Sequence, residues 1–204
     1  MNTAQLYNNI VRMYPKLAFA SDGWRFTGYL NGNMKLEKGK TKLVLDSYHA
    51  FCLLTEVRAW KRLYLPSFSL NGKTILDVGS GGGETAALFF EAGASKVIMV
   101  ESDPTQESFA RQNAKANGWS IDYYAELFSP KHFNLDFGWG KVDCEGGESC
   151  LLSSDVKPPF KPFVIELHPA ILVKEVYDSI ISKFGLLEVS EGWDAETGIW
   201  RTPE

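Results

Sequence analysis

Cysteine is scarce in this sequence, and long apolar runs are missing from it. The three cysteines among 204 residues, at positions 52, 144 and 150, are too few and too scattered for a disulfide framework or a thiolate zinc site. The longest apolar stretches, such as residues 86–90, are far too short to cross a bilayer. The first five residues lack the basic and apolar regions of a secretory signal. We therefore expect a globular, cytoplasmic protein with no membrane partner.

The net charge of −4 hides an uneven distribution. Residues 1–72 carry 10 lysines and arginines against 4 acids, whereas residues 73–204 carry 11 against 21. A basic first part can mark a nucleic-acid or acidic partner. It can also reflect lysines that protect an exposed strand edge, and we favour this second interpretation. The lysines concerned are Lys35, Lys38, Lys40 and Lys42.

From residue 72 onward, short apolar segments alternate with amphipathic ones, which is typical of a parallel sheet covered by helices. The last two strand-like segments are joined by a turn and read as a hairpin. We expect an α/β fold with a doubly wound, mostly parallel seven-stranded sheet closed by an antiparallel hairpin. The expected strands are 74–78, 96–100, 121–124, 141–144, 163–167, 187–190 and 199–202, and the clearest expected helices are 84–92 and 173–184.

The first 71 residues have a different pattern and predict a small α+β extension, which could form a lid on the acceptor side of the site. A helix is expected at 5–13 and a longer one at 48–65. Three short strands are expected between them, at 24–30, 34–37 and 42–45, with glycine-containing turns. The predicted division is thus 1–71 for the extension and 72–204 for the main domain.

A glycine-rich loop follows the first strand of the main domain. The segment Asp77-Val78-Gly79-Ser80-Gly81-Gly82-Gly83 lies directly between a predicted strand and a predicted helix. Glycines allow a sharp turn and a close ligand, and a helix N-terminus favours a negative group. Glu101 ends the next strand, where a carboxylate can accept hydrogen bonds from the hydroxyls of a ribose. Together these features predict a site for an adenosine-containing cofactor.

The details of the loop favour S-adenosylmethionine over a dinucleotide. A dinucleotide fingerprint that starts at Gly79 fails, because Glu84 occupies its last glycine position. Asp77 would repel a pyrophosphate and suits the ammonium group of a methionine. The motif resembles the first motif of the class I S-adenosylmethionine-dependent methyltransferases, and Glu101 resembles their second.

This resemblance covers roughly residues 72–202 and implies roles for several residues. The loop residues would hold the methionine part of the cofactor, and Glu101 with the adjacent Ser102 would hold the ribose. Glu126 would lie near the adenine amino group, although it could equally be an exposed turn residue. The cofactor-binding residues expected in this way are Asp77, Gly79, Ser80, Gly81, Gly83, Glu101, Ser102 and Glu126.

A second motif, Lys141-Val142-Asp143-Cys144-Glu145-Gly146-Gly147-Glu148, follows near the end of the fourth strand. It is similar to a segment of the FkbM-type methyltransferases, which act on hydroxyls of sugars and natural products. Asp143 and Glu145 lie two residues apart, so in a regular strand both would face the ligand crevice. These two and His168 are the expected catalytic residues, as acceptor ligands or as a general base. Glu145 and Glu148 could instead have only a structural role, as caps of the helix that follows the glycine pair. A metal held by the three is conceivable, but their spacing does not predict one.

We therefore expect O-methylation of a sugar-like or natural-product small molecule that carries a hydroxyl. The alternative in the same chemistry is an RNA (tRNA) methyltransferase. It is favoured by the basic first part and by Asn113–Asn117, which resembles a helix of some tRNA-modifying enzymes. A third reading is a non-catalytic cofactor-binding module. The sequence indicates neither the acceptor atom nor the oligomeric state.

Overall fold

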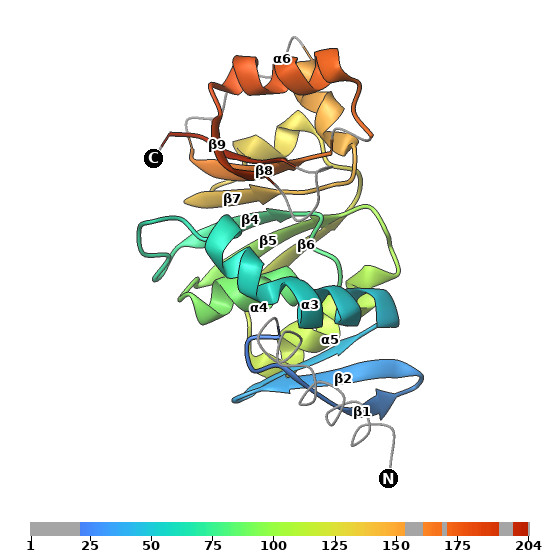
Figure 1. Ribbon diagram of the computed structural model, residues 1–204. Coiled ribbons are helices and arrows are strands. Elements are labelled where there is room, and N and C mark those ends of the chain that lie inside the picture. The colour runs from blue at the N-terminus through green and yellow to red at the C-terminus, as the bar shows by residue number, and fades with distance from the viewer. Residues whose placement is uncertain (1–20, 154–160, 169–170, 192–197, 204) are drawn as a thin grey trace.

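The computed structural model describes residues 21–153, 161–168, 171–191 and 198–203. Its centre is a seven-stranded sheet with the strand order β6-β5-β4-β7-β8-β10-β9 (Figure 1). Strands β6, β5, β4, β7 and β8 run parallel, and β10 is antiparallel to both β8 and β9. The predicted sheet and its closing hairpin are confirmed. The strands are β4 (Thr74–Val78), β5 (Lys96–Glu101), β6 (Ile121–Ala125), β7 (Trp139–Val142), β8 (Phe163–Leu167), β9 (Leu187–Glu191) and β10 (Gly198–Arg201).

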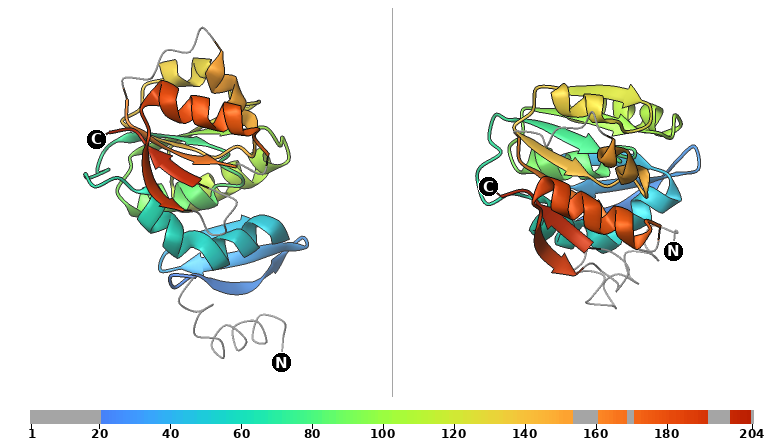
Figure 2. Two further views of the ribbon diagram at one scale, coloured as in Figure 1. Left: turned by 45° about the horizontal axis from the view of Figure 1, so that its top comes forward. Right: turned by 90° about the horizontal axis from the view of Figure 1, so that it is seen from above.

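Helices cover both faces of this sheet (Figures 1 and 2). The side chains of a strand point alternately to the two faces. In β4, Ile75 packs into the core shared with α3, α4 and α5, whereas Leu76 and Val78 pack into a second core with α6. The first face carries α3 (Ser47–Tyr64), α4 (Glu84–Glu91) and α5 (Gln106–Asn117); the other carries η1 (Pro130–Asn134), η2 (Gly147–Leu152) and α6 (Lys174–Phe184).

A small antiparallel sheet lies against α3 and α5, on their side away from the large sheet (Figure 2). It consists of β1 (Arg25–Leu30), β2 (Asn33–Lys38) and β3 (Thr41–Leu45), as the sequence predicts. Asn113 Nδ2 donates to Val44 O at 3.0 Å and Asn113 Oδ1 accepts from Val44 N at 2.8 Å. Asn117 makes the same pair of bonds with Lys42. These two asparagines therefore satisfy the backbone edge of β3 and dock the small sheet.

The extension and the main sheet share one hydrophobic core. Phe26 of β1, Leu43 of β3 and Val57 of α3 belong to the same buried cluster as Ile75 of β4. The division into residues 1–71 and 72–204 stays a prediction. The helix predicted at residues 5–13 lies outside the described residues. In the described part of the chain, no helix has the length and apolar character needed to span a bilayer.

The fourth strand of the main domain ends earlier than the sequence predicts. β7 stops at Val142, so Asp143 and Glu145 lie in the turn that follows and not on one face of a strand. Glu145 has a positive φ of 53°, and Gly146 follows with a φ of 94°. Glu148 fixes this turn, because its carboxylate accepts hydrogen bonds from the backbone of Cys144 and Gly146 at 2.9 and 2.8 Å. The expectation of a regular strand through Asp143 and Glu145 was wrong.

Candidate functional site

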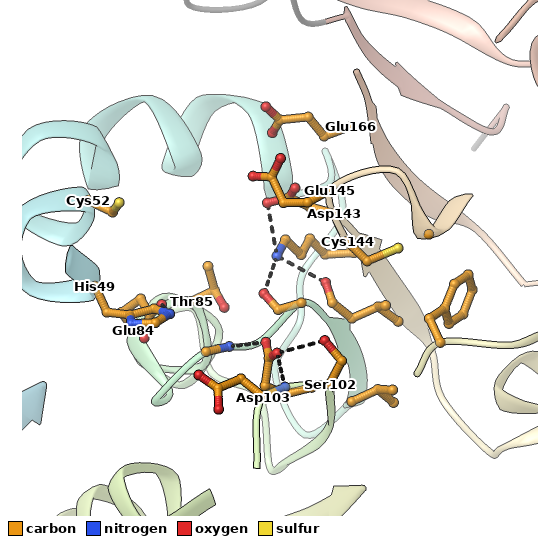
Figure 3. A pocket seen from close by; sticks show the side chains of 18 of the residues that line it. His49, Cys52, Glu84, Thr85, Ser102, Asp103, Asp143, Cys144, Glu145 and Glu166 are labelled. Atoms are coloured by element: carbon orange, nitrogen blue, oxygen red, sulfur yellow. Dashed lines mark hydrogen bonds and ion pairs between the residues drawn. The ribbon is translucent and has the colours of Figure 1, made fainter. Parts of the chain in front are cut away.

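A pocket of about 610 Å³ lies at the carboxyl ends of the parallel strands, where open α/β sheets bind ligands. Its volume is in the range of small-molecule and cofactor sites. Figure 3 shows Ser102 and Asp103 at one end and Asp143, Glu145 and Glu166 grouped at the other. One wall comes from α3, which contributes Tyr48, His49, Cys52, Glu56, Trp60 and Tyr64. This wall belongs to the part of the chain that the sequence assigns to the extension, and its role as a lid stays a prediction.

The glycine loop connects β4 to α4 beneath the pocket, and Gly79 and Gly81 line it. Gly79 N donates to Val100 O at 2.9 Å, and Gly81 N donates to Glu101 Oε2 at 3.1 Å. A Cβ at Gly79 would lie 1.7 Å from the backbone oxygen of Asp143, and the φ of Gly79 is +68°. Gly79 is thus required by the close approach of the turn after β7, a packing reason that the sequence does not reveal.

Glu101 ends β5 at the pocket, as predicted. Its Oε1 accepts a hydrogen bond from Asp103 N at 2.8 Å, and Ser102 Oγ lies 3.4 Å from the same oxygen. Its other oxygen holds the loop through Gly81, so the carboxylate is fixed from both sides. Within the described ranges, Oε2 accepts only the hydrogen bond from Gly81 N, so its second lone pair remains for a hydroxyl group of a ligand. Glu101, Ser102 and Asp103 all line the pocket.

Asp77 and Ser80 are fully buried and are not among the residues that line the pocket. Asp77 Oδ2 accepts a hydrogen bond from Thr85 Oγ1 at 2.6 Å, and its Oδ1 lies 3.6 Å from Lys141 Nζ. Burial raises the pKa of Asp77 to about 6, although the nearby Lys141 ammonium opposes this shift. The cation beside Asp77 in this structure is therefore the Lys141 ammonium group.

Lys141 is a central residue of the site that the sequence reasoning missed. Its side chain is 1% exposed, and its Nζ donates to the backbone oxygens of Val78 and Gly79 at 3.1 and 2.8 Å. Nζ also lies 3.3 Å from Asp143 Oδ2. Burial opposes its charge, but Asp143 and Asp77 outweigh burial and raise the pKa of Lys141. A fixed ammonium thus joins the glycine loop to the acidic turn.

The acidic end of the pocket combines Asp143 and Glu145 with Glu166 of β8. Tyr64 OH donates to Glu166 Oε2 at 2.5 Å and lies 3.4 Å from Asp143 Oδ2. Burial, and next the charge of Asp143, raise the pKa of Glu166 to about 8. Burial also raises the pKa of Glu145, with the nearby Asp143 carboxylate acting in the same direction. Both predicted carboxylates line the pocket, together with Tyr64 and Glu166, which the sequence reasoning did not place there.

His168 lies behind these carboxylates. It is 8% exposed and is not among the pocket-lining residues. Its Nε2 is 3.5 Å from Glu145 Oε2 and 3.9 Å from Asp143 Oδ1. The structure therefore brings the three predicted catalytic residues together, with the two acids in front of the imidazole. Their roles in catalysis stay a prediction.

His49 and Glu84 form a second group on the pocket wall that the sequence reasoning missed. His49 Nδ1 is 2.7 Å from Asp46 Oδ2, and its Nε2 is 3.9 Å from Glu84 Oε1 (Figure 3). Burial would lower the pKa of His49, but Glu84 and Asp46 outweigh it and raise this pKa. The sequence does contain a sign that α3 lines a pocket. One face of the helix carries polar and aromatic side chains every four residues: Tyr48, Cys52, Glu56, Trp60 and Tyr64.

Glu126 follows β6 and lines the pocket. Its Oε2 is 2.7 Å from Lys131 Nζ, and its Oε1 is 3.1 Å from His132 Nε2. The hydrogen bond from Lys131 lowers the pKa of Glu126. The role proposed for Glu126 beside an adenine stays a prediction, and its carboxylate already has two partners within the chain.

Curated relatives share part of the sequence. The ribosomal protein L11 methyltransferase of Tolumonas auensis is 37% identical over 75 residues, which are 36% of this chain and 26% of that protein. The protein of the same name from Salmonella arizonae is 40% identical over 68 residues, or 33% of this chain and 22% of that protein. The chain thus matches about a quarter of the length of these relatives. No known family model matches it.

Solved structures share the fold over most of the chain. M. jannaschii TYW2 in complex with AdoMet has a TM-score of 0.55 at 13% identity, and the match covers 86% of both chains. The T. thermophilus 16S rRNA N2 G1207 methyltransferase RsmC, in complex with AdoMet and guanosine, has a TM-score of 0.51 at 15% identity. This match covers 89% of this chain and 50% of that one.

The fold is therefore the Rossmann-like α/β fold of class I methyltransferases, as the sequence predicts. The sequence relatives are named as methyltransferases of a ribosomal protein. Their names give no support to the small-molecule acceptor that we expected first. The resemblance to the FkbM-type family has no counterpart among them.

Proposed function

We propose that this chain is an S-adenosylmethionine-dependent methyltransferase. The observation that carries this proposal is one continuous pocket with a cofactor end and an acidic acceptor end. Gly79, Gly81 and Glu101 line the first, and Asp143 and Glu145 line the second. Glu101 Oε2 has a lone pair left for a ribose hydroxyl, and the pocket volume suits a cofactor together with part of an acceptor. The sequence relatives named as methyltransferases support the same activity.

The cofactor, when bound, supplies an electrophilic methyl group on a sulfonium sulfur. The chain mainly has to hold an acceptor nucleophile close to this methyl and aligned with it. The acceptor also has to lose a proton, and Asp143 and Glu145, which line the pocket at that end, are the candidate bases. Tyr64 OH and Lys141 Nζ lie 3.4 and 3.3 Å from Asp143 Oδ2, which fixes the direction of this carboxylate.

The acceptor in this proposal is a group on a macromolecule, and a protein fits the charge of the pocket better than RNA does. Among the described residues, eight Asp and Glu side chains line the pocket, whereas His49 and Lys141 are the only basic side chains there. RNA binding depends on basic side chains that contact phosphates. Lys38 of the basic extension is already paired with Asp22 and Glu91, at 2.6 and 2.9 Å. The names of the sequence relatives also point to a protein acceptor.

A small-molecule hydroxyl is the second candidate acceptor, and one observation favours it. The segment 141–148, on which the resemblance to FkbM-type enzymes rests, forms the acidic end of the pocket. A polyol can donate hydrogen bonds to several carboxylates at once. Methyl transfer to separate acceptor pools distinguishes a small-molecule acceptor and an RNA acceptor from a protein acceptor.

The experiment measures transfer of a labelled methyl group to three separate acceptor pools: ribosomal proteins, total RNA and small sugars. We expect label in the protein pool. Asp143→Asn and Glu145→Gln should each retain affinity for S-adenosylhomocysteine, and turnover should fall by about 10²–10⁴ if the residue acts as a base. Glu107→Gln, a change at a half-buried side chain of α5 that does not line the pocket, is the matched control and should leave transfer intact.

Label in RNA or in sugars would replace the protein acceptor with the corresponding alternative. Binding of S-adenosylhomocysteine without transfer to any pool would favour the non-catalytic module. Full activity of both acid variants would assign these carboxylates a structural role only.

A further inference from the structure

Two carboxylates and one imidazole converge at the acceptor end of the pocket. One ligand atom each from Asp143, Glu145 and His168 lie within 4.8 Å of one another. His168 Nε2 is 3.9 Å from Asp143 Oδ1 and 3.5 Å from Glu145 Oε2. These separations are too long for hydrogen bonds. Two ligands that share one cation at about 2.1 Å lie about 3.0–3.4 Å apart, so a small closure would bring the three atoms into one coordination sphere.

The imidazole provides an independent indication of a ligand. His168 is more than nine-tenths buried, at 8% exposure, and its Nδ1 is sealed from solvent without a hydrogen-bond partner. A buried polar atom without a partner costs stability. The ring carries its Nε2 toward the carboxylates that line the pocket, and this nitrogen also lies 3.8 Å from Glu166 Oε1. The side chain is therefore held in place without a hydrogen bond that would explain its position.

The surroundings of His168 resemble those of a metal-binding histidine. Such a histidine coordinates through one ring nitrogen and directs the N–H of the other toward a carboxylate or carbonyl. Glu148 Oε1 lies 3.9 Å from Nδ1, on the side of the ring away from Asp143 and Glu145. Glu148 is fully buried, and its two bonds to the turn backbone fix its carboxylate.

We propose that Asp143, Glu145 and His168 bind a divalent cation at the acceptor end of the pocket. One nitrogen and two oxygen ligands suit Mn²⁺ or Zn²⁺ better than Mg²⁺ or Ca²⁺, which prefer oxygen alone. Asp143 and Glu145 line the pocket, so the remaining coordination positions would face an acceptor. A hydroxyl or amine bound there would be oriented and would lose its proton more readily. Only this last role rests on the proposed methyltransferase function.

The test is titration of the metal-stripped full chain with MnCl₂, followed by electron paramagnetic resonance, and with ZnCl₂, followed by calorimetry. We expect one saturable site per chain. Glu145→Gln and His168→Gln should each weaken binding at least tenfold, and Glu148→Gln should weaken it by about 10–100-fold through the orientation of His168. Glu107→Gln, which changes a half-buried acid outside the cluster, should bind the metal as the unchanged chain does.

The Glu145 variant keeps the test valid if a buried variant fails to fold, because the Glu145 side chain is 67% exposed. Absence of a saturable site, or equal affinity in Glu145→Gln and the unchanged chain, would overturn the proposal. Binding of S-adenosylhomocysteine is measured on the same samples. Cofactor binding without metal binding refutes the metal site alone, whereas metal binding without cofactor binding refutes the proposed function alone.

Discussion

Glu84 should make the stability of this protein depend on pH, because its carboxyl group is buried at the start of α4. It is 5% exposed, and its Oε2 has no hydrogen-bond partner. His49 Nε2 faces its other oxygen at 3.9 Å. Burial raises the pKa of Glu84 to about 7 from its usual value of 4.5, and the charge of His49 offsets this shift only in part. The folded state therefore favours the protonated carboxyl.

The magnitude follows from the two pKa values. A group with a raised pKa in the folded state contributes stability that is fully present below its unfolded pKa and is lost as the pH rises through its folded pKa. For Glu84 this window runs from about 4.5 to about 7. A difference of this size corresponds to about 3 kcal/mol. Glu84→Gln keeps the side chain neutral at every pH, so the variant should not lose this stability.

The assay is urea unfolding of the unchanged chain and of Glu84→Gln at several pH values from 5 to 8. The difference between their free energies of unfolding should move by about 2–3 kcal/mol in favour of the variant as the pH rises. Glu175→Gln, an exposed change on α6, should give a difference that does not depend on pH. A constant difference for Glu84→Gln as well would refute the buried-carboxyl reasoning.

Two further substitutions test how the site is held. Lys141→Met leaves Asp77 buried without its cation and should lower the free energy of unfolding by about 3–5 kcal/mol. A urea unfolding midpoint equal to that of the unchanged chain would contradict a stabilising role of the Lys141–Asp77 ion pair. Gly79→Ala places a Cβ against Asp143 O, whereas Gly118→Ala has a similar φ of +69° and open space around it. Gly79→Ala should lower the melting temperature clearly more than Gly118→Ala, and equal losses would contradict the packing role of Gly79.

The regular elements could be predicted from the sequence because their signals are local. Gly118 and Gly185 end α5 and α6 in the left-handed conformation, where glycine carries no steric penalty. The buried strand segments alternate with helical patterns, which defines the parallel sheet. Glu101 was located correctly for the same reason, since it ends a strand with a clear apolar pattern.

The parts that could not be predicted depend on contacts between distant segments. Nothing in the sequence around Lys141 shows that the carboxylates of Asp77 and Asp143 lie beside its ammonium group. The turn after β7 begins at Asp143 because it packs on Gly79, more than sixty residues away in the sequence. His49 joins the site only because α3 packs beside the glycine loop. Pairing of this kind leaves no periodic pattern in a single sequence.

Calorimetric titration of the full chain with S-adenosylhomocysteine tests the proposed cofactor most directly. We expect one site per chain with micromolar affinity, and a rise in melting temperature through mass action. Glu101→Ala should weaken this binding by about 1.5–3 kcal/mol, the range for hydrogen bonds to a charged group. Absence of binding, or tighter binding of NAD than of S-adenosylhomocysteine, would contradict the assignment of this pocket to S-adenosylmethionine.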